Sequence, residues 1–114
     1  MNQKNINQLV TESYQNALDH GWHDEPRTVG DLICLMHSEL SEALEEYRNG
    51  HEPTEIYYNS NKPSKPEGIP VELADCVIRI FDFCGKYNID LQSAIEQKMA
   101  YNKTRPYRHG NKKV

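Results

Sequence analysis

Apolar residues recur at helical spacing in two long stretches of the chain, and a face repeated in this way becomes the buried side of an amphipathic helix. In residues 28–50 the repeat consists of Val29, Leu32, Ile33, Met36, Leu40, Ala43, Leu44 and Tyr47. In residues 70–85 it consists of Leu73, Cys76, Val77, Ile80, Phe81 and Cys84. No stretch shows the alternation that a half-buried strand requires. The sequence therefore predicts an all-α fold.

Capping and helix-breaking residues divide the chain into four predicted helices. Thr28 is a candidate N-cap for the first long stretch, and Gly50 ends it. Pro70 suits the first turn of the next helix, and Gly85 lies near its end. A shorter helix is expected within the first twenty residues, and Asp90 can cap a fourth. Four antiparallel helices in one bundle are the simplest arrangement.

A long loop is predicted between the second and third helices. Residues 50–68 contain three prolines among Asn, Ser and Lys, which excludes a continuous helix. Loops of this length inside small domains usually have a function or are mobile. We expect this segment, with Tyr57 and Tyr58, to act as a lid.

The chain has 114 residues, of which 37% are hydrophobic, and a net charge of −4. This length fits a single domain, residues 1–114, whereas the small apolar fraction predicts a thin core and an oligomer that shares apolar faces. All three cysteines lie in apolar stretches and are expected to be buried, reduced thiols. Neither a leader nor an apolar stretch long enough to cross a membrane is apparent, which predicts a cytoplasmic protein without membrane contact.

Carboxylates follow one edge of the apolar face on both long helices. On a wheel of about 100° per residue, Glu39, Glu42 and Glu46 fall on one side of the apolar stripe. On the next long helix Glu72 and Asp75 again share one flank. Packed side by side, the ExxE and ExxD pairs would bring four like charges together, which is costly without a cation. The pattern predicts a metal site formed by Glu39, Glu42, Glu72 and Asp75.

The donor set indicates which metal would bind. Oxygen ligands without imidazole suit Mg²⁺, with Mn²⁺ as the alternative. Di-iron bundles use Glu-x-x-His on two helices, and no glutamate here has a histidine three residues later. The competing interpretation is a solvated acidic face, in which Arg79 pairs with Asp75 one turn away. Spacing alone leaves both interpretations open.

The end of the chain is basic, in contrast to the rest. Residues 98–114 contain six bases and no acid, whereas residues 1–97 have a net charge of −10. Lys98 and Asn102 lie one turn apart on the fourth predicted helix and Arg105 follows, so these three residues are candidates for phosphate binding. We expect a basic tail at about residues 103–114. A nonspecific nucleic-acid arm is the alternative, although we expect no stable nucleic-acid binding.

A base-binding position is predicted just after the first helix. Trp22 is the single tryptophan and lies in a polar stretch beside His23. An indole ring can stack on a nucleobase, but a tryptophan at a helix end is also commonly part of the core. Trp22 and His23 are therefore candidates for contact with a base.

Three stretches together resemble the MazG-like all-α nucleoside triphosphate pyrophosphohydrolases, a superfamily that includes dimeric dUTPases and phosphoribosyl-ATP pyrophosphatases. They are SELSEALEEYRNG (38–50), PEGIPVELADCVIRIFDF (66–83) and KMAYNKTRPYRHG (98–110). The resemblance implies a helical bundle that forms a homodimer or homotetramer, with Mg²⁺ on the ExxE and ExxD carboxylates. It also implies that Lys98, Asn102 and Arg105 contact the phosphates of a nucleoside triphosphate.

The implied reaction is hydrolysis to a nucleoside monophosphate and pyrophosphate, as part of nucleotide-pool housekeeping. Water would attack a phosphorus of the triphosphate, and a carboxylate would orient or deprotonate that water. Glu42 is the first candidate for this base, and Glu46 is the second. The alternatives are a dUTPase or phosphoribosyl-ATP pyrophosphatase of narrow specificity, or a non-catalytic helical interaction module whose acidic residues are merely solvated.

Overall fold

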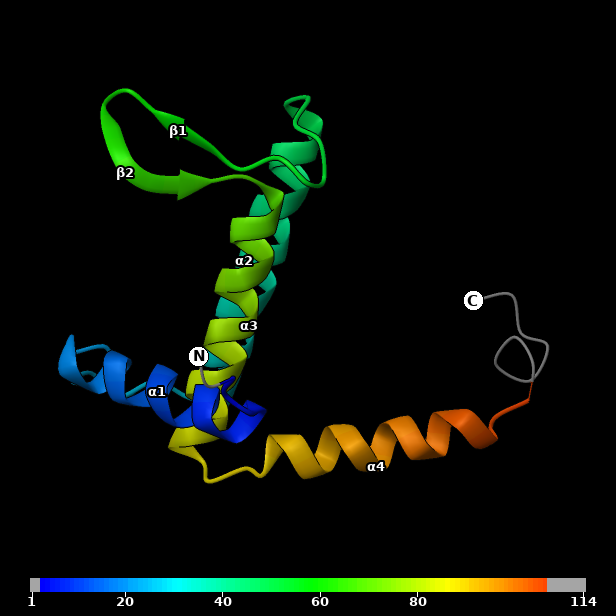
Figure 1. Ribbon diagram of the computed structural model, residues 1–114. Coiled ribbons are helices and arrows are strands. Elements are labelled where there is room, and N and C mark those ends of the chain that lie inside the picture. The colour runs from blue at the N-terminus through cyan, green and yellow to red at the C-terminus, as the bar shows by residue number, and fades with distance from the viewer. Residues whose placement is uncertain (1–2, 107–114) are drawn as a thin grey trace.

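The computed structural model describes residues 3–106 and contains four helices and one pair of strands (Figure 1). The elements are α1 (Ile6–Asp19), α2 (Val29–Arg48), β1 (Tyr57–Asn59), β2 (Lys62–Glu67), α3 (Ile69–Lys86) and α4 (Leu91–Thr104). The prediction of four helices is confirmed. Within residues 3–106, no helix has both the length and the apolar character that a bilayer crossing requires.

Local sequence signals determine where the helices begin. The Thr28 hydroxyl accepts a hydrogen bond from the backbone N–H of Asp31, whose carboxylate accepts one from the backbone N–H of Thr28. This reciprocal pair satisfies two donors that the start of α2 would otherwise leave free. Pro70 occupies the first turn of α3, and Asp90 caps α4 through the backbone N–H of Ser93. These predicted helix starts are confirmed.

Helix α3 is the centre of the packed part of the fold. It lies beside α2 and antiparallel to it, and α1 crosses it near its C-terminal end (Figure 1). The buried apolar side chains are Val10, Leu32, Ala43, Cys76 and Cys84. The predicted thin core is confirmed, but Cys34, which was expected to be buried, is exposed.

Gly85 is the last residue but one of α3, so the predicted end of this helix near Gly85 is confirmed. A Cβ added at Gly85 would overlap the Cβ of Tyr14 on α1. Helices α1 and α3 therefore approach too closely at this point for any residue but glycine. Helix α3 continues to Lys86, and Asn88, with a φ of 56°, turns the chain towards α4.

The segment between α2 and α3 contains an antiparallel hairpin, so the prediction of a chain without strands was wrong there. Tyr57 of β1 lies opposite Glu67 of β2, and Asn59 lies opposite Lys62, with an irregularity between the two pairs. The strands are mostly exposed and therefore have no apolar face whose alternation the sequence could show. Gly68, with a φ of 127°, joins the hairpin to α3, and a side chain there would overlap the carbonyl oxygen of Glu55.

Helix α4 projects away from the other helices (Figure 1) and has no buried residue. Asn7 of α1 holds its start: the Asn7 side chain accepts from the backbone N–H of Gln92 and donates to Asp90. Met99 on this helix is 58% exposed. A single chain therefore shows three packed helices and a separate fourth, instead of the closed four-helix bundle that we expected. Residues 107–114 of the predicted basic tail lie outside the described residues.

Candidate metal centre and adjoining pocket

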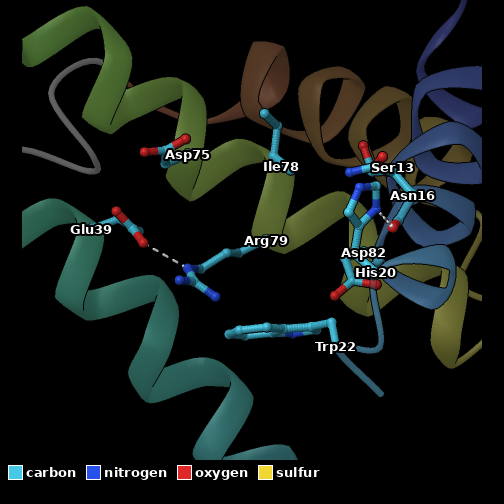
Figure 2. Close-up of a pocket in the computed structure, with 10 residues that line it drawn as sticks. Ser13, Asn16, His20, Trp22, Glu39, Asp75, Ile78, Arg79 and Asp82 are labelled. Atoms are coloured by element: carbon cyan, nitrogen blue, oxygen red, sulfur yellow. Dashed lines mark hydrogen bonds and ion pairs between the residues drawn. The ribbon is translucent and has the colours of Figure 1, made fainter. Parts of the chain in front are cut away.

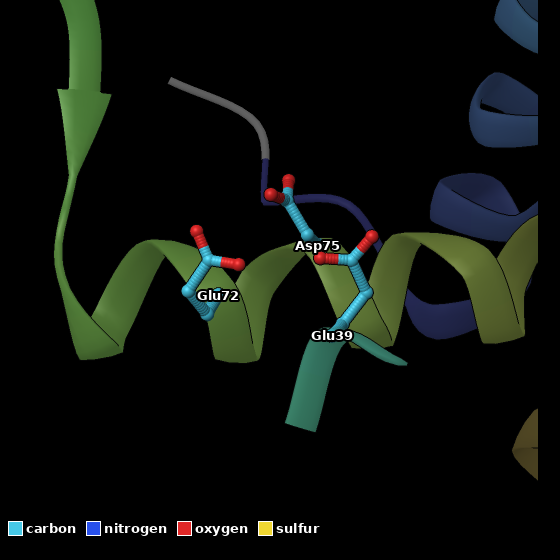
Figure 3. A group of neighbouring side chains, drawn as sticks. All are labelled: Glu39, Glu72 and Asp75. Carbon is cyan, nitrogen blue, oxygen red and sulfur yellow. The ribbon is translucent and has the colours of Figure 1, made fainter. Parts of the chain in front are cut away.

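Three carboxylates from two helices converge where α2 and α3 lie side by side (Figure 3). Glu39 of α2 and Glu72 and Asp75 of α3 each offer an oxygen atom, and these atoms all lie within 4.8 Å of one another. The i, i+3 spacing places Glu72 and Asp75 on one face of α3, towards Glu39. The structure thus brings together three of the four predicted ligands, which we call the acidic cluster.

The fourth predicted ligand, Glu42, lies beside the acidic cluster. Its side chain is hydrogen-bonded to that of Glu72, although Glu42 itself is exposed. Burial, followed by this hydrogen bond and the charge of Glu42, raises the pKa of Glu72 to about 8. At neutral pH and without a cation, Glu72 is therefore largely protonated.

The negative charges of the acidic cluster are only partly compensated. Atom Oε2 of Glu72 is buried and has no hydrogen-bond partner within residues 3–106. Burial, and then the charge of Glu39, also raise the pKa of Asp75. An orphaned buried oxygen among carboxylate donors is a suitable ligand environment for a hard divalent cation such as Mg²⁺ or Mn²⁺. The residues present therefore fit the predicted metal.

Arg79 of α3 supplies some of the missing positive charge. Its Nε donates a hydrogen bond of 2.7 Å to Oε1 of Glu39 on α2 (Figure 2), and its charge partly offsets the rise in the pKa of Asp75. The sequence pointed to a surface pair with Asp75, whereas the observed hydrogen bond joins two helices at a buried carboxylate. Sequence reasoning missed this role, although a helical wheel places Arg79 about midway between Glu72 and Asp75.

A pocket of about 340 Å³ adjoins the acidic cluster (Figure 2). Glu39 and Asp75 line it at one side, and Arg79 and Trp22 line it further along. The other lining residues are Ser13, Asn16, Ala17, His20, Ile78 and Asp82. The pocket therefore connects two carboxylates of the cluster to an aromatic ring and to the polar side of α1.

Trp22 lies on this pocket, as its predicted role requires. The guanidinium carbons of Arg27 and Arg79 lie 4.1 Å and 4.9 Å from the centroid of the indole ring. Arg27 also donates a hydrogen bond to the backbone carbonyl of Trp22. These cation–π contacts hold the ring at the pocket. Arg79 thereby links Trp22 to Glu39 of the acidic cluster.

His23, the other predicted base contact, does not line the pocket. Its Nε2 lies 2.7 Å from Oδ1 of Asp82, and both side chains are nearly buried. The imidazole also packs against Tyr14, with ring centroids 5.5 Å apart. His23 thus joins the loop after α1 to α3. His20, which the sequence did not single out for this role, lines the pocket instead.

Glu46, the second candidate base, is not part of the acidic cluster and contacts the hairpin. The Tyr57 hydroxyl donates to Oε2 of Glu46 at 2.8 Å, and His51 Nε2 lies 3.7 Å from the same oxygen. The His51 ring stacks on Tyr57 with centroids 4.3 Å apart. The hydrogen bond to Glu46, with burial, raises the pKa of Tyr57 to about 12. Glu46 therefore anchors the hairpin to α2.

The three predicted phosphate-binding residues lie apart from the carboxylates. Lys98 and Asn102 are exposed on α4, and Arg105 is exposed at its C-cap. No described residue of α4 lines the pocket. Lys98 Nζ instead lies 4.9 Å from the ring centroid of Tyr101 on the same helix. Within one chain, these residues and the acidic cluster occupy separate parts of the molecule (Figure 1).

Comparison with protein-family models, curated protein sequences and solved structures gives no match to this chain. The MazG-like assignment therefore stays a prediction based on the three motif stretches. The function has to be inferred from the acidic cluster and the pocket themselves.

Proposed function

We propose that the protein is a Mg²⁺-dependent nucleoside triphosphate pyrophosphohydrolase of the MazG-like type, acting in the cytoplasm on the nucleotide pool. The observation that supports this proposal is the convergence of Glu39, Glu72 and Asp75 beside a pocket that reaches Trp22. A metal at the carboxylates would attract phosphate oxygens, and the indole ring offers a surface for a base. One pocket would thus contact both the phosphates and the base of a nucleotide.

In this proposal the acidic cluster would bind the metal, and Glu42 would act on the attacking water. Glu39, Glu72 and Asp75 would hold Mg²⁺, or Mn²⁺ as the alternative, which supplies neutralisation of the charge on the phosphate oxygens. With Glu72 as a metal ligand, the neighbouring Glu42 would be the carboxylate that orients or deprotonates water. Glu46 is the weaker candidate for this base because the Tyr57 hydroxyl is bonded to it.

Arg79 and Trp22 would position the substrate. In the structure the Arg79 guanidinium contacts both Glu39 and the indole ring. With Glu39 as a metal ligand, the Arg79 guanidinium would be available to a phosphate oxygen, which is also a charge-assisted contact. We therefore assign phosphate binding to Arg79 in addition to the predicted residues of α4.

A non-catalytic helical module is the second candidate, because the Arg79–Glu39 pair already offsets part of the charge of the cluster. Thermal unfolding separates the two functions. The enzyme should be stabilised by Mg²⁺ together with a nonhydrolysable nucleoside triphosphate, since a ligand that binds only the folded state raises the melting temperature. The module should show no such shift.

The direct test is a panel of nucleoside triphosphates incubated with the protein and Mg²⁺ or Mn²⁺. We expect equal amounts of pyrophosphate and nucleoside monophosphate, and no release without metal. The panel should include dUTP and phosphoribosyl-ATP, because turnover of one of these alone would identify the narrow-specificity alternative. Absence of release from every nucleotide with both metals would contradict the proposed function.

A further inference from the structure

Lys65 is a basic residue of the hairpin that a carboxylate holds in place. Its Nζ lies 3.1 Å from Oε1 of Glu67, two residues further along β2, and Oε2 of Glu67 accepts a hydrogen bond of 3.1 Å from Asn59 on β1. Side chains two residues apart lie on the same face of a strand. The Lys65 ammonium is therefore linked through Glu67 to both strands, although its side chain is 60% exposed.

The hairpin that carries Lys65 is fixed at its base. The Tyr57 hydroxyl is bonded to Glu46 of α2, and Gly68 alone joins β2 to α3. Strand β2 contacts α3 and leads directly to the turn that carries Glu72 (Figure 3). The fold thus determines the position of Lys65 relative to the acidic cluster.

Lys65 and the acidic cluster lie close enough for their charges to interact. The hydrogen bond to Glu67 is the main cause of a raised pKa of Lys65, and the charges of Glu72 and Asp75 add to it. Burial raises the pKa of Asp75, and the charge of Lys65 partly offsets this rise. Exposed charges are largely screened from one another beyond about 8–10 Å at physiological ionic strength. The Lys65 ammonium is therefore a neighbour of two carboxylates that would hold the metal.

Lys65 and the pocket lie at opposite ends of the acidic cluster along α3. The hairpin precedes the cluster in this helix, whereas Ile78, Arg79 and Asp82 of the pocket follow it. No described residue of the hairpin lines the pocket. A ligand with its base against Trp22 and its phosphates at the carboxylates would therefore extend its far end towards Lys65.

The chemistry of the ammonium group favours a polyphosphate at this position. A cation beside a metal site opposes metal binding unless an anion binds with the metal. A lysine ammonium has three N–H donors, so Lys65 can keep its pair with Glu67 and still donate to a ligand oxygen. Hydrogen bonds from an ammonium to a phosphate oxygen are charge-assisted and therefore strong. The alternative is an ordinary surface ion pair, which would leave ligand binding unchanged when Lys65 is replaced.

We propose that the Lys65 ammonium binds the phosphate group farthest from the base in a polyphosphate ligand held at the acidic cluster. The identity of this ligand as a nucleoside triphosphate rests on the proposed function, in which Lys65 would contact the pyrophosphate group that leaves. The resemblance to the MazG-like enzymes assigns phosphate binding to residues near the end of the chain. The hairpin is therefore an additional source of positive charge for the phosphates.

Isothermal titration calorimetry of the complete chain tests this role with two probes, inorganic pyrophosphate at constant free Mg²⁺ and Mg²⁺ alone. Lys65→Met should weaken pyrophosphate binding about tenfold, because a charge-assisted hydrogen bond is lost. The affinity for Mg²⁺ alone should stay unchanged or rise by up to about threefold, because a repelling charge is removed. Lys65→Arg keeps the charge and should retain most of the pyrophosphate affinity.

Lys62→Met is the matched control for this experiment. Lys62 is an exposed lysine of the same strand and forms no ion pair among the residues that the structure describes, so the variant should bind both probes like the wild type. Unchanged pyrophosphate binding in Lys65→Met, or an equal loss in Lys62→Met, would overturn the proposal. A parallel loss of Mg²⁺ and pyrophosphate affinity in Lys65→Met would indicate a structural role and would overturn it as well.

Chemical acetylation tests the contact in the unaltered protein. The wild type is treated with the N-hydroxysuccinimide ester of acetic acid, in Mg²⁺ alone and in Mg²⁺ with pyrophosphate, and each modified lysine is quantified by mass spectrometry. We expect pyrophosphate to protect Lys65 and to leave the reactivity of Lys62 unchanged. Equal acetylation of Lys65 under both conditions would contradict its contact with the ligand.

Activity measurements separate this inference from the proposed function on which it rests. For a nucleoside triphosphate that is turned over, Lys65→Met should raise KM about tenfold but leave the affinity for the monophosphate product unchanged, because that product lacks the outer phosphates. An equal loss of affinity for the monophosphate would overturn the assigned position of Lys65. A wild type that binds pyrophosphate but hydrolyses no nucleotide would refute the proposed function, and calorimetry would still decide the role of Lys65.

Discussion

Helices α3 and α4 show how little a helix start reveals about the packing of a helix. Helix α4 has the better local start, since the Asp90 side chain caps it, whereas the N-cap of α3 is Gly68 and makes no side-chain hydrogen bond. Yet α3 packs against α1 and α2 and bears two of the three clustered carboxylates, while α4 buries no residue. Capping defines where a helix begins, and the surrounding elements decide whether it belongs to a core.

The largest expected effect is on catalytic activity, and it should differ between substitutions on α3 and on α4. Asp75→Asn on α3 should reduce Mg²⁺-dependent pyrophosphate release by about 100-fold or more, because a ligand of the metal is lost. Lys98→Met on α4 should weaken nucleotide binding but leave the thermal stabilisation by Mg²⁺ alone intact. Glu45→Gln, at an exposed carboxylate outside the cluster, is the matched control and should be neutral. Retained turnover in Asp75→Asn, with helicity unchanged, would refute the metal site.

The second effect concerns the packing of α1 on α3. Gly85→Ala should lower the free energy of unfolding by about 1–3 kcal/mol, because its methyl group would overlap Tyr14. Gly30→Ala in α2 is the control: the nearest atom to its Cβ is 3.7 Å away, and alanine favours a helix. Chemical denaturation measures both changes. Equal stability of the two variants would mean that the α1–α3 crossing is looser than the structure shows.

The acidic cluster should make the metal-free protein sensitive to pH. Glu72 has a pKa of about 8 in the folded protein, against an ordinary value of 4.5. Its contribution to stability is therefore complete below about pH 4.5 and is lost as the pH rises towards 8, because the unfolded chain releases the proton first. The melting temperature of Glu72→Gln should fall less over this interval, and Mg²⁺ should restore wild-type stability at pH 8. Identical pH profiles for variant and wild type would show that Glu72 is not protonated.

The smallest effects compare the two side-chain caps. Thr28→Ala at the start of α2 should cost about 1 kcal/mol of global stability, as N-cap losses commonly do. Asp90→Ala at the start of α4 should cost less than about 0.5 kcal/mol in dilute protein, because α4 can unfold without the core. Hydrogen exchange of the α4 amides should accelerate in Asp90→Ala. An equal global loss in both variants would show that α4 is coupled to the packed helices.

The helices and their starts could be predicted because their causes are local. The capping box at Thr28, the proline at the start of α3 and the cap at Asp90 each act within one turn of the chain. The acidic cluster was also predictable, since helical spacing assigns each carboxylate to a face and two long amphipathic helices pack side by side. Two details differ: Glu42 lies beside the cluster instead of within it, and spacing could not show that the Arg79 guanidinium reaches Glu39 on the other helix.

The parts that could not be predicted depend on distant contacts. The hairpin is stabilised by strand pairing and by the Tyr57–Glu46 hydrogen bond, and its Lys- and Pro-rich strand shows no alternation. Gly85 correctly indicates the nearby end of α3, but the sequence could not show that it also admits Tyr14 of α1. His23 gave no sequence signal of its pairing with Asp82, 59 residues later. The position of α4 likewise has no local determinant.

The dual contact of Arg79 has a practical consequence. The same guanidinium is bonded to Glu39 and lies over Trp22, which is the single tryptophan of the chain. Any cation that displaces Arg79 from Glu39 will also alter the surroundings of the indole. The intrinsic fluorescence of the protein should therefore change when the acidic cluster is occupied, and this chain can be titrated with metal without an added dye.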